Sequence, residues 1–458
     1  MKYVDGQDRF VIIGAGPAGI SAAITAINRG FPAERITLVE KGQRHDPSRV
    51  SGFGGAGANS DGKLVLESEI GGELASYVSA DIPELLDRVL ELYLGFLESP
   101  ERETYEQMRG RFRDPTAEAQ IQRASIGAGL QFVPADIVPL GTATCHRIVD
   151  AWYDFLTERG ADVLLETKAT HFASGDGVWQ VACEGREEIS GRWLLVAPGR
   201  SGHDFLVRTL AENRLDTVNG PIDVGVRVET DANLTQPLTD ATYEFKLRGL
   251  IEGERVRTFC VCPQGSVLVE QYDSDLLAVN GQTRPESPTG RTNFAVLHTI
   301  SLDEPCHSPN QYAQLYIRTA NILGAKNPIV QVWPNFAQRR RSRWSDLGKC
   351  FVDPTLDRAL PGDIRLALNA KSCRVLEAFM HALDSDGLLE GLCSNRTLMY
   401  APEAKLYTVR PAELTEHLES ECENLFFAGD GSGITRGLVQ ASASGMLVGG
   451  EVARRAGV

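Results

Sequence analysis

The stretch RFVIIGAGPAGISAAITAINRG, residues 9–30, decides the fold of this chain. It begins with a short apolar run, Phe10–Ile13, whose β-branched residues are typical of a strand buried in a parallel sheet. Good helix formers occupy residues 20–28, and Gly30 ends the predicted helix. Between strand and helix stand three glycines in the spacing G-x-G-x-x-G: Gly14, Gly16 and Gly19. The stretch therefore predicts the strand, turn and helix that open a βαβ unit.

The three glycines have separate roles in a turn that binds a dinucleotide. Gly14 makes the tight turn, Gly16 lets the backbone approach a pyrophosphate, and Gly19 lets the helix pack closely on the strand. The helix N-terminus then presents free N–H groups and a partial positive charge to the anion. We predict that the cofactor contacts of this turn are Gly14, Gly16, Pro17, Ala18 and Gly19.

A second strand, predicted over RITLVEK, completes the unit and places Glu40 near its end. Glu40 follows Gly19 by 21 residues, the distance at which an acidic residue accepts hydrogen bonds from the adenosine ribose. A carboxylate there would repel a 2′-phosphate, which leaves NAD or FAD as the nucleotide. We predict that Glu40 and Lys41 contact it.

A second glycine-rich stretch, SGFGGAGANSDGKL at residues 51–64, also contains the G-x-G-x-x-G spacing. The polar segment before it is not a strand, and no long apolar-periodic helix follows it, so a second nucleotide fold is not expected. Glycines leave backbone N–H groups uncovered, and we predict that this loop runs along the ribityl and isoalloxazine parts of the same FAD. The assigned contacts are Gly54, Gly55, Ala56, Gly57, Asn59, Ser60, Gly62 and Lys63.

The C-terminal stretch NLFFAGDGSGITRGLVQASASGMLVGGEVARRAG favours FAD over NAD. It predicts a strand over Leu425–Ala428, a Gly-Asp-Gly turn and a helix from about Thr435. Asp430 can accept a hydrogen bond from a ribityl hydroxyl, and the helix N-terminus would stabilise negative charge on a reduced flavin. Small residues at 441–445 allow this helix to pack closely on its neighbours. The predicted contacts are Gly429, Asp430, Gly437, Leu438 and Val439.

A further strand, Leu194–Ala197, ends in Pro198-Gly199. It resembles the strand ending in Ala-Thr-Gly that many FAD enzymes carry beside the cofactor. Proline replaces the threonine here, which removes a side-chain hydroxyl. We assign Ala197 and Gly199 to the cofactor site.

Together these segments resemble the glutathione-reductase-like FAD/NAD(P)-binding oxidoreductases. A narrower resemblance is to a poorly characterised family of bacterial FAD-dependent dehydrogenases, distant relatives of desaturase and lycopene-cyclase-type flavoproteins. Its blocks here are GFGGAGANSDGKL, LGTATCHRIVDAW, APGRSGHDFL, DVGVRVE, TFCVCPQG and GDGSGITRGLVQASASG. The resemblance implies non-covalently bound FAD and a redox reaction, and it names no substrate. The chain departs from the family in a shorter segment after Glu40, and at Ile434, Thr435 and Arg436, where the family has aromatic and glycine residues.

We expect an α/β fold with a discontinuous Rossmann-type FAD-binding domain, in which βαβ units form a central parallel sheet, and a mixed α+β substrate domain. The expected FAD-binding segments are 1–64, 141–220 and 421–458, and the expected substrate segments are 65–140 and 221–420. Helical periodicity predicts helices within residues 76–97, 145–160 and 372–383.

Composition and charge narrow the possible partners of this 458-residue chain. Its net charge of −15 disfavours nucleic acid. No apolar run of about eighteen residues is present, and the N-terminal apolar run is too short for a signal peptide, so we expect a cytoplasmic protein, as monomer or homodimer. The basic run RRRSR, Arg339–Arg343, is expected to be a solvated loop, with a site for an anionic substrate or a nicotinamide phosphate as the alternative.

The nine cysteines fit a reducing compartment and form neither a C-x-x-C motif nor a cluster with zinc spacing, so no metal site is expected. Cys260 and Cys262 in TFCVCPQG lie two residues apart, on one face of a predicted strand. We interpret them as buried strand cysteines, with a redox or substrate-facing thiol as the alternative.

The expected reaction is hydride transfer between flavin N5 and a small organic substrate, as in a dehydrogenase or reductase. A flavin monooxygenase and a non-catalytic FAD-bound protein are the alternatives. Because no second dinucleotide fold is predicted, NAD(P)H would be a transient electron partner. Spacing does not identify the catalytic acid or base. The candidates are Lys63, His146 and Arg436, with Asp61, His203 and Tyr272 beside them.

Overall fold

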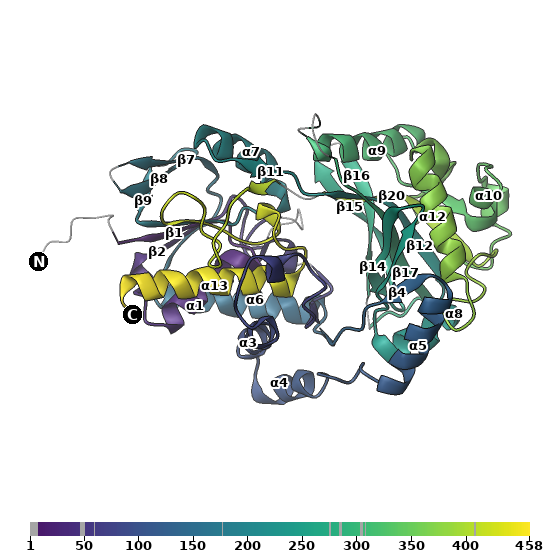
Figure 1. Ribbon diagram of the computed structural model, residues 1–458, viewed down its shortest axis with the longest axis horizontal. Coiled ribbons are helices and arrows are strands. Elements are labelled where there is room, and N and C mark those ends of the chain that lie inside the picture. The colour runs from purple at the N-terminus through teal and green to yellow at the C-terminus, as the bar shows by residue number, and fades with distance from the viewer. Residues whose placement is uncertain are drawn as a thin grey trace, which may run out of the picture. The chain divides into compact units, whose positions relative to one another are not determined.

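The computed structural model describes residues 8–45, 51–58, 60–175, 177–273, 276–283, 286–302, 306, 308–406 and 409–458. The predicted contact Asn59 lies outside these residues. The chain divides into two compact units (Figure 1). The first unit comprises the described residues of Met1–Met108, Val138–Gly220 and Tyr407–Val458, and the second those of Arg109–Ile137 and Pro221–Leu406.

Among the described residues, this division differs from the expected domains in residues 65–108, 138–140 and 409–420, which lie in the first unit rather than with the substrate segments. Three hydrogen bonds show why residues 68–73 belong there. The Glu73 N–H donates to the Ile434 carbonyl at 2.9 Å, and the Gln440 amide donates to the carbonyls of Ser68 and Ile70 at 3.0 and 2.7 Å. These bonds tie residues 68–73 to the C-terminal segment.

A five-stranded parallel sheet forms the centre of the first unit, in the order β22-β10-β1-β2-β6. Every residue of β1, β2, β10 and β22 is buried, as expected for parallel strands that are covered on both faces. The strands predicted at residues 10–13, 35–41, 194–197 and 425–428 are confirmed. The strands are β1 (Phe10–Ile13), β2 (Ile36–Val39), β6 (Asp162–Leu164), β10 (Trp193–Val196) and β22 (Leu425–Phe427).

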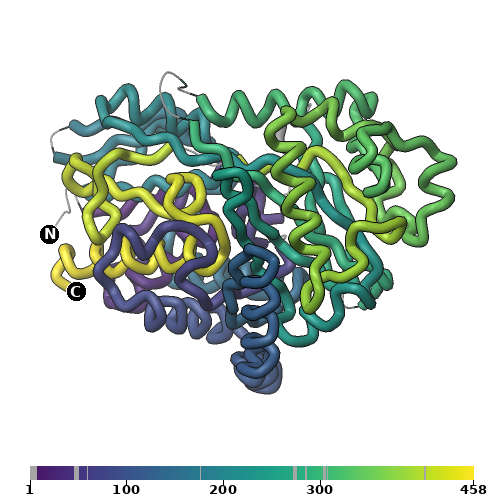
Figure 2. The backbone as a smooth tube through the Cα atoms, turned by 45° about the vertical axis from the view of Figure 1, so that its right-hand side comes forward, coloured from purple at the N-terminus to yellow at the C-terminus, as the bar shows by residue number. Residues whose placement is uncertain are grey.

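Two helices from opposite ends of the chain, α1 (Pro17–Asn28) and α13 (Leu438–Ala456), pack against each other in this unit (Figure 1). Figure 2 shows the purple N-terminal and yellow C-terminal segments running together. The close packing predicted for the small residues of α13 is confirmed, because a Cβ on Gly445 would stand 1.9 Å from the Ala18 carbonyl oxygen. Helix α13 begins three residues after the predicted start at Thr435.

The other helices and strands of the first unit surround this core. The helices are α2 (Gly55–Ala58), α3 (Ile82–Leu94), α4 (Ser99–Glu106), α6 (Thr142–Glu158) and α7 (His203–Glu212). The strands are β3 (Lys63–Val65), β5 (Ile137–Pro139), β7 (Ala169–Gly175), β8 (Val178–Cys183), β9 (Ile189–Gly191), β11 (Thr217–Val218) and β21 (Arg410–Pro411). Helices α3 and α6 confirm two of the helices predicted from apolar periodicity.

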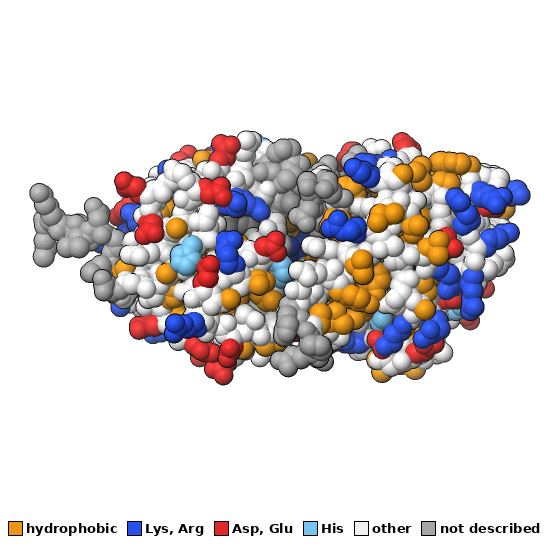
Figure 3. All heavy atoms as spheres, turned by 90° about the horizontal axis from the view of Figure 1, so that it is seen from above, with side chains coloured by type: hydrophobic (Ala, Val, Ile, Leu, Met, Phe, Trp, Pro, Cys, Tyr) orange, Lys and Arg blue, Asp and Glu red, His pale blue; other side chains and the backbone are white. Residues whose placement is uncertain are grey.

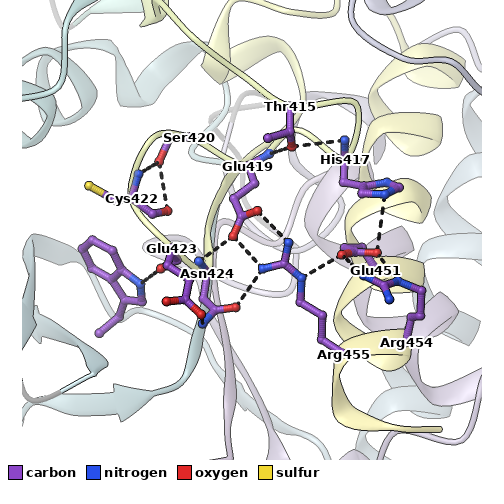
Figure 4. Close-up of polar contacts among 11 residues, drawn as sticks. Thr415, His417, Glu419, Ser420, Cys422, Glu423, Asn424, Glu451, Arg454 and Arg455 are labelled. Atoms are coloured by element: carbon purple, nitrogen blue, oxygen red, sulfur yellow. Dashed lines mark hydrogen bonds and ion pairs between the residues drawn. The ribbon is translucent and has the colours of Figure 1, made fainter.

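The C-terminal end of α13 is fixed by ion pairs to the loop that precedes β22 (Figure 4). The Arg455 guanidinium donates to both carboxylate oxygens of Glu419, each at 2.6 Å, and to Glu451 at 2.7 Å. Glu451 is buried and also accepts from Arg454 at 2.7 Å. This network joins the last turns of α13 to the loop that precedes β22.

An eight-stranded sheet forms the second unit, in the order β19-β18-β20-β12-β17-β14-β13-β4. All neighbouring strands in it are antiparallel except β18 and β19. The strands are β4 (Leu130–Phe132), β12 (Ile222–Asp231), β13 (Leu247–Ile251), β14 (Glu254–Cys262), β17 (Arg291–Ile300), β18 (Ile329–Val332), β19 (Leu360–Pro361) and β20 (Thr397–Lys405). A separate hairpin consists of β15 (Ser266–Asp273) and β16 (Leu276–Gln282).

The two faces of this sheet differ in chemistry. Alternate residues of β12, including Val224 and Val226, join an apolar core with α9 and α12. The intervening residues of β12 include Arg227 and Glu229, which are fully buried on the other face. The helices of the unit are α5 (Pro115–Gly127), α8 (Ala232–Thr242), α9 (Pro309–Leu323), α10 (Trp333–Ala337), α11 (Trp344–Leu347) and α12 (Ala370–Leu383), of which α12 was predicted. Among the described residues, no helix combines the length and apolar character needed to cross a bilayer.

The basic run Arg339–Arg343 is a loop of the second unit between α10 and α11. Its arginines are exposed, and Figure 3 shows cationic side chains gathered at the right-hand end of the molecule, in the second unit. Ser342 is fully buried within the run and accepts hydrogen bonds from the Val332 N–H and the Asn335 amide, both at 3.0 Å. The prediction of a solvated loop is confirmed, and one buried serine anchors it.

Candidate functional site

The first glycine turn joins β1 to α1, and two of its glycines are required by packing. Gly14 has a φ of +101°, and a Cβ there would stand 2.1 Å from the Ala197 carbonyl oxygen. A Cβ on Gly19 would stand 2.0 Å from the Gly14 carbonyl oxygen. The turn thus lies directly against the end of β10 and against the first turn of α1. Both predicted roles, the tight turn and the close helix–strand packing, are observed.

Gly16 differs from its two neighbours. It is the N-cap of α1, with a φ of −85°, and no side chain caps the helix there. A Cβ on Gly16 would meet no atom within 4 Å. The space beside this glycine is open, and the first turn of α1 points its N–H groups out of the helix end. This is the arrangement that an anion at a helix N-terminus requires.

The second glycine loop packs on the first. The Gly54 N–H donates to the Ala15 carbonyl at 2.7 Å. A Cβ on Gly57 would stand 2.7 Å from Pro17 Cγ and 2.8 Å from Leu438 Cδ2. Gly55, with a φ of +54°, lies beside Gly16, since its Cβ would stand 3.2 Å from Gly16 Cα. In its described residues the loop contains the four-residue helix α2, which includes Ala56, and the start of β3, and no long helix follows the glycines as a second nucleotide fold would need.

Glu40, at the end of β2, is buried and holds both glycine loops through backbone N–H groups. Its Oε2 accepts from the Ala15 N–H at 3.0 Å, and its Oε1 accepts from those of Gly42 and Gly52, each at 2.9 Å. The sequence predicted a carboxylate that receives ribose hydroxyls. The structure shows a carboxylate that already receives three backbone donors, and a carboxylate has about four acceptor positions.

The ends of β10 and β22 meet beside the first turn. The exposed Lys41 donates to the Ser201 hydroxyl at 2.9 Å, which ties the end of β2 to the turn after Gly199. Gly199 has a φ of +64° and open space where a Cβ would stand. A Cβ on Gly431 would stand 2.4 Å from the Gly199 nitrogen, so the two turns are in contact.

The Gly-Asp-Gly turn leads to the N-terminus of α13. The Thr435 hydroxyl donates to Asp430 at 2.7 Å, and the Ser444 hydroxyl accepts from the Gly429 N–H at 3.0 Å. Gly437 is the N-cap of α13, and no side chain caps the helix there. Leu438 is half-buried and Val439 buried. The predicted contacts of this segment therefore gather at the N-terminus of α13.

The catalytic candidates lie in different surroundings. Lys63 and Asp61 form a buried ion pair, with 3.6 Å between Nζ and Oδ2, at the end of the second glycine loop. Gly62 between them has a φ of +63°, and its N–H donates to the Ser60 hydroxyl at 3.1 Å. His146 is exposed on α6.

Two other catalytic candidates, Arg436 and His203, are largely shielded from solvent. The Arg436 guanidinium is mostly buried and lies 3.7 Å from the Glu73 carboxylate. His203 begins α7, and burial lowers its pKa, which keeps the imidazole neutral at neutral pH. Its Nδ1 is buried and has no hydrogen-bond partner among the described residues. The side chain of Tyr272 lies outside the described residues.

Three residues near these candidates carried no signal in the sequence. Cys145 is buried against Gly62, whose Cβ would stand 2.4 Å from its Sγ. Burial, with the Asp61 charge nearby, raises the pKa of this thiol to about 12. Tyr77 lies under the Arg410 guanidinium, 5.3 Å from ring centroid to Cζ, and burial raises its pKa. Tyr77 and Arg410 lie far apart in the sequence, and only the fold brings them together.

The second unit has a groove of its own, of about 460 Å³. A cation and a carboxylate, Arg111 and Asp240, face it together with the aromatic pair Phe112 and Tyr243, whose ring centroids are 5.1 Å apart. No motif marked these residues in the sequence.

The residues of the first unit fit a flavin dinucleotide. Open space lies beside Gly16 and Gly199, two helices begin without side-chain caps, and the residues around these helix starts are half-buried within an otherwise buried core. Uncapped helix starts and bare glycines suit phosphate groups and a close-lying ring system.

Comparisons with known proteins find two family models and one relative that resemble this chain. Residues 9–223 match the family model described as FAD dependent oxidoreductase (DAO), and residues 387–457 match that of Glucose inhibited division protein A (GIDA). A protein of Clostridium beijerinckii, described as uncharacterized, is 23% identical over 476 residues, which cover 96% of this chain and 80% of that protein.

Among solved structures, the chain is similar to glycine oxidase from Geobacillus kaustophilus, at 14% identity and a TM-score of 0.40, over 98% of this chain and 95% of that chain. It is also similar to L-proline dehydrogenase from P. horikoshii, at 12% identity and a TM-score of 0.43, over 97% and 92% of the two chains. The family match over residues 9–223 contains the first turn, Glu40, the second glycine loop and the Pro198-Gly199 turn, and it identifies the protein as an FAD-dependent oxidoreductase.

Proposed function

We propose that the protein is a dehydrogenase or reductase that transfers a hydride between FAD and a small organic substrate such as an amine, an alcohol or an unsaturated ring. The observation that carries the proposal is the meeting of three remote segments at Gly57, where a Cβ would collide with both Pro17 and Leu438. The first turn, the second glycine loop and the start of α13 therefore pack together. When bound to these segments, FAD would supply the hydride acceptor or donor.

Different segments of the chain have different roles in binding the cofactor. The N-terminus of α1 and the bare backbone at Gly16 bind the pyrophosphate. Glu40 fixes the first turn and the second loop relative to each other through its three N–H bonds. The N-terminus of α13 would stabilise negative charge on a reduced flavin ring. In this proposal the first unit binds FAD and the second unit supplies the substrate domain.

Cys145 argues for a small organic substrate rather than a protein or peptide disulfide. Disulfide reductases attack through a thiolate. Cys145 is the cysteine packed on the second glycine loop, and its pKa of about 12 keeps it protonated at neutral pH. The buried Lys63–Asp61 pair and Arg436 are the polar groups that we propose for orienting the substrate or moving a proton. NAD(P)H would act as a transient partner, and we propose a cytoplasmic monomer or homodimer.

The test uses purified full-length protein. It should be yellow, with the absorbance of oxidised flavin. Under anaerobic conditions, a panel of amines, alcohols and enones is added to oxidised protein and, separately, to photoreduced protein, and flavin absorbance is followed. Bleaching or recovery by one class supports the proposal. Oxygen consumption in step with a hydroxylated product contradicts it in favour of a monooxygenase, and a flavin that no compound reduces or reoxidises contradicts any enzymatic role.

A further inference from the structure

Cys260 and Cys262, in the second unit, form a pair of adjacent thiols. They lie in β14, at a bulge between Phe259 and Cys262 where the pairing with β17 shifts register. Cys260 has a φ of +45°, a left-handed conformation that residues other than glycine rarely adopt. The two sulfur atoms are 3.9 Å apart. In a regular strand, residues two apart rise by about 6.6 Å, so the bulge accounts for this close approach.

A buried cation faces the pair. The Arg227 side chain is fully buried, and its Nη2 donates to the Cys262 sulfur at 3.2 Å and to the Cys260 carbonyl at 2.7 Å. Its Nε donates to Asn293 at 2.8 Å, and its Nη1 lies 3.4 Å from Glu403 Oε1. Burial by itself lowers the pKa of Arg227, but the Glu403 carboxylate raises it above its ordinary value, so the guanidinium stays charged.

The surroundings of Arg227 are a charged network rather than an apolar core. Lys405 is buried and donates to Glu270 at 3.0 Å and to Glu403 at 3.3 Å. Burial raises the pKa of Glu403, and the charges of Arg227 and Lys405 oppose that shift. A hydrogen bond from a cation favours the thiolate form of a cysteine.

The two thiols also differ in access. Cys262 is fully buried, whereas Cys260 is partly exposed. One thiol can therefore meet a small reagent, and the other, beside Arg227, is held ready to react with the first. This is the arrangement of an attacking and a resolving cysteine.

We propose that Cys260 and Cys262 are a reversible dithiol–disulfide site that reacts with low-molecular-weight disulfides. The Cys260 thiolate attacks one sulfur of the reagent, the S–S bond of the reagent breaks, and one small thiolate leaves. The Cys262 thiolate then attacks Cys260 Sγ, the mixed disulfide breaks, and the second small thiolate leaves. Two protein thiols are oxidised, one small disulfide is reduced to two thiols, and the two cysteine protons end on the leaving thiolates.

This site is independent of the proposed hydride transfer, because neither its residues nor its oxidant belong to the flavin-binding segments. In a reducing compartment it would form and revert with the redox state rather than act as a permanent cross-link. Its formation removes the thiolate that accepts from Arg227 and thereby changes the buried network.

The experiment exposes the flavin-containing protein to glutathione disulfide, blocks the remaining thiols and digests the protein with trypsin. The peptide that begins at Thr258 contains Cys260 and Cys262 and no other cysteine. We expect this peptide to lose the mass of two hydrogen atoms and to regain it with dithiothreitol. A glutathione adduct that persists on the wild-type peptide, or an unreacted peptide, overturns the proposal.

Serine variants separate the two steps without a large change in volume. Cys262→Ser should accumulate a glutathione adduct on Cys260, and Cys260→Ser should leave Cys262 unreacted. Cys350, a partly exposed cysteine of the same unit that donates to the Asn395 carbonyl at 3.0 Å, is the matched control and should give at most an adduct. Arg227→Lys should slow ring closure by about tenfold relative to adduct formation. If Arg227→Lys does not fold, the two serine variants still test the proposal.

Discussion

A side chain on Gly445 would occupy the position of the Ala18 carbonyl oxygen, since its Cβ would stand only 1.9 Å from that atom. One turn later, a Cβ on Gly449 would stand 2.2 Å from the Ala22 carbonyl oxygen. Helices α1 and α13 therefore touch backbone to backbone over two turns. This contact determines the position of α13 along α1. It thereby determines the place of Leu438 beside Gly57 and Pro17.

Gly445→Val should separate these helices. Insertion of side-chain atoms into a close-packed contact costs about 1–3 kcal/mol, and more where backbone atoms must move. We expect a lower melting temperature and loss of flavin in the same preparation, both measured on full-length protein. Gly127→Ala is the control, because Gly127 ends α5 and a Cβ there would meet no atom within 4 Å, so its melting temperature should not fall. A stable, yellow Gly445→Val protein would contradict the role of this contact.

Gly16→Val should separate cofactor binding from folding. The open space beside Gly16 and its φ of −85° accommodate a side chain without collision. We expect the apoprotein to melt at about the wild-type temperature while its FAD dissociation constant rises at least about tenfold, measured by titration with flavin fluorescence. Gly19→Val, whose Cβ collides with the Gly14 carbonyl oxygen, should instead unfold the first unit. Unchanged FAD affinity in Gly16→Val would place the pyrophosphate elsewhere.

The sequence was sufficient for the elements whose residues act locally. Strand β1 ends where the apolar run ends, and α1 follows the glycines, because backbone conformation there is determined by neighbours in the chain. A Cβ on Gly14 or Gly19 would collide with the backbone of another segment or turn. The spacing of the glycines therefore also reflects tertiary packing. A short pattern could therefore predict the first strand, the turn and the helix that follows it.

Contacts between remote side chains could not be predicted in this way. Nothing near Glu40 in the sequence indicates that it receives the Gly52 N–H, which lies on a separate loop. The pairing of Tyr77 with Arg410 likewise depends on the fold, as does the placement of residues 65–108 in the first unit. The sequence of an amphipathic helix such as α3 shows which of its faces is buried. It does not show which other element covers that face.

Glu40→Gln should weaken the hydrogen bonds that connect the two glycine loops. The amide oxygen can replace Oε1 as acceptor for Gly42 and Gly52, but the amide nitrogen cannot accept from the Ala15 N–H. A hydrogen bond to a charged group contributes about 1.5–3 kcal/mol, so the apoprotein itself should be less stable. Thermal melting of apoprotein is the measurement. If only the flavin affinity fell and the apoprotein melted as wild type, the carboxylate would serve the ribose alone.

Acidification should weaken the C-terminal network of Figure 4. The hydrogen bond from Arg454, aided by that from Arg455, lowers the pKa of Glu451 to about 2, although burial opposes the shift. An unfolded glutamate titrates near about 4.3, so the unfolded chain takes up this proton first as the pH falls. The stability that Glu451 contributes is therefore complete above about pH 4.3 and is lost progressively toward pH 2.

Glu451→Gln tests this dependence. The variant should be less stable than wild type at neutral pH, and the difference between the two should shrink as the pH falls from about 4.3 to 2, followed by urea unfolding of each protein. Glu106→Gln is the matched control, because Glu106 pairs with Arg102 on the surface, where an ion pair contributes little. A difference between wild type and Glu451→Gln that stayed constant over this range would mean that the carboxylate charge does not hold α13 to the loop before β22.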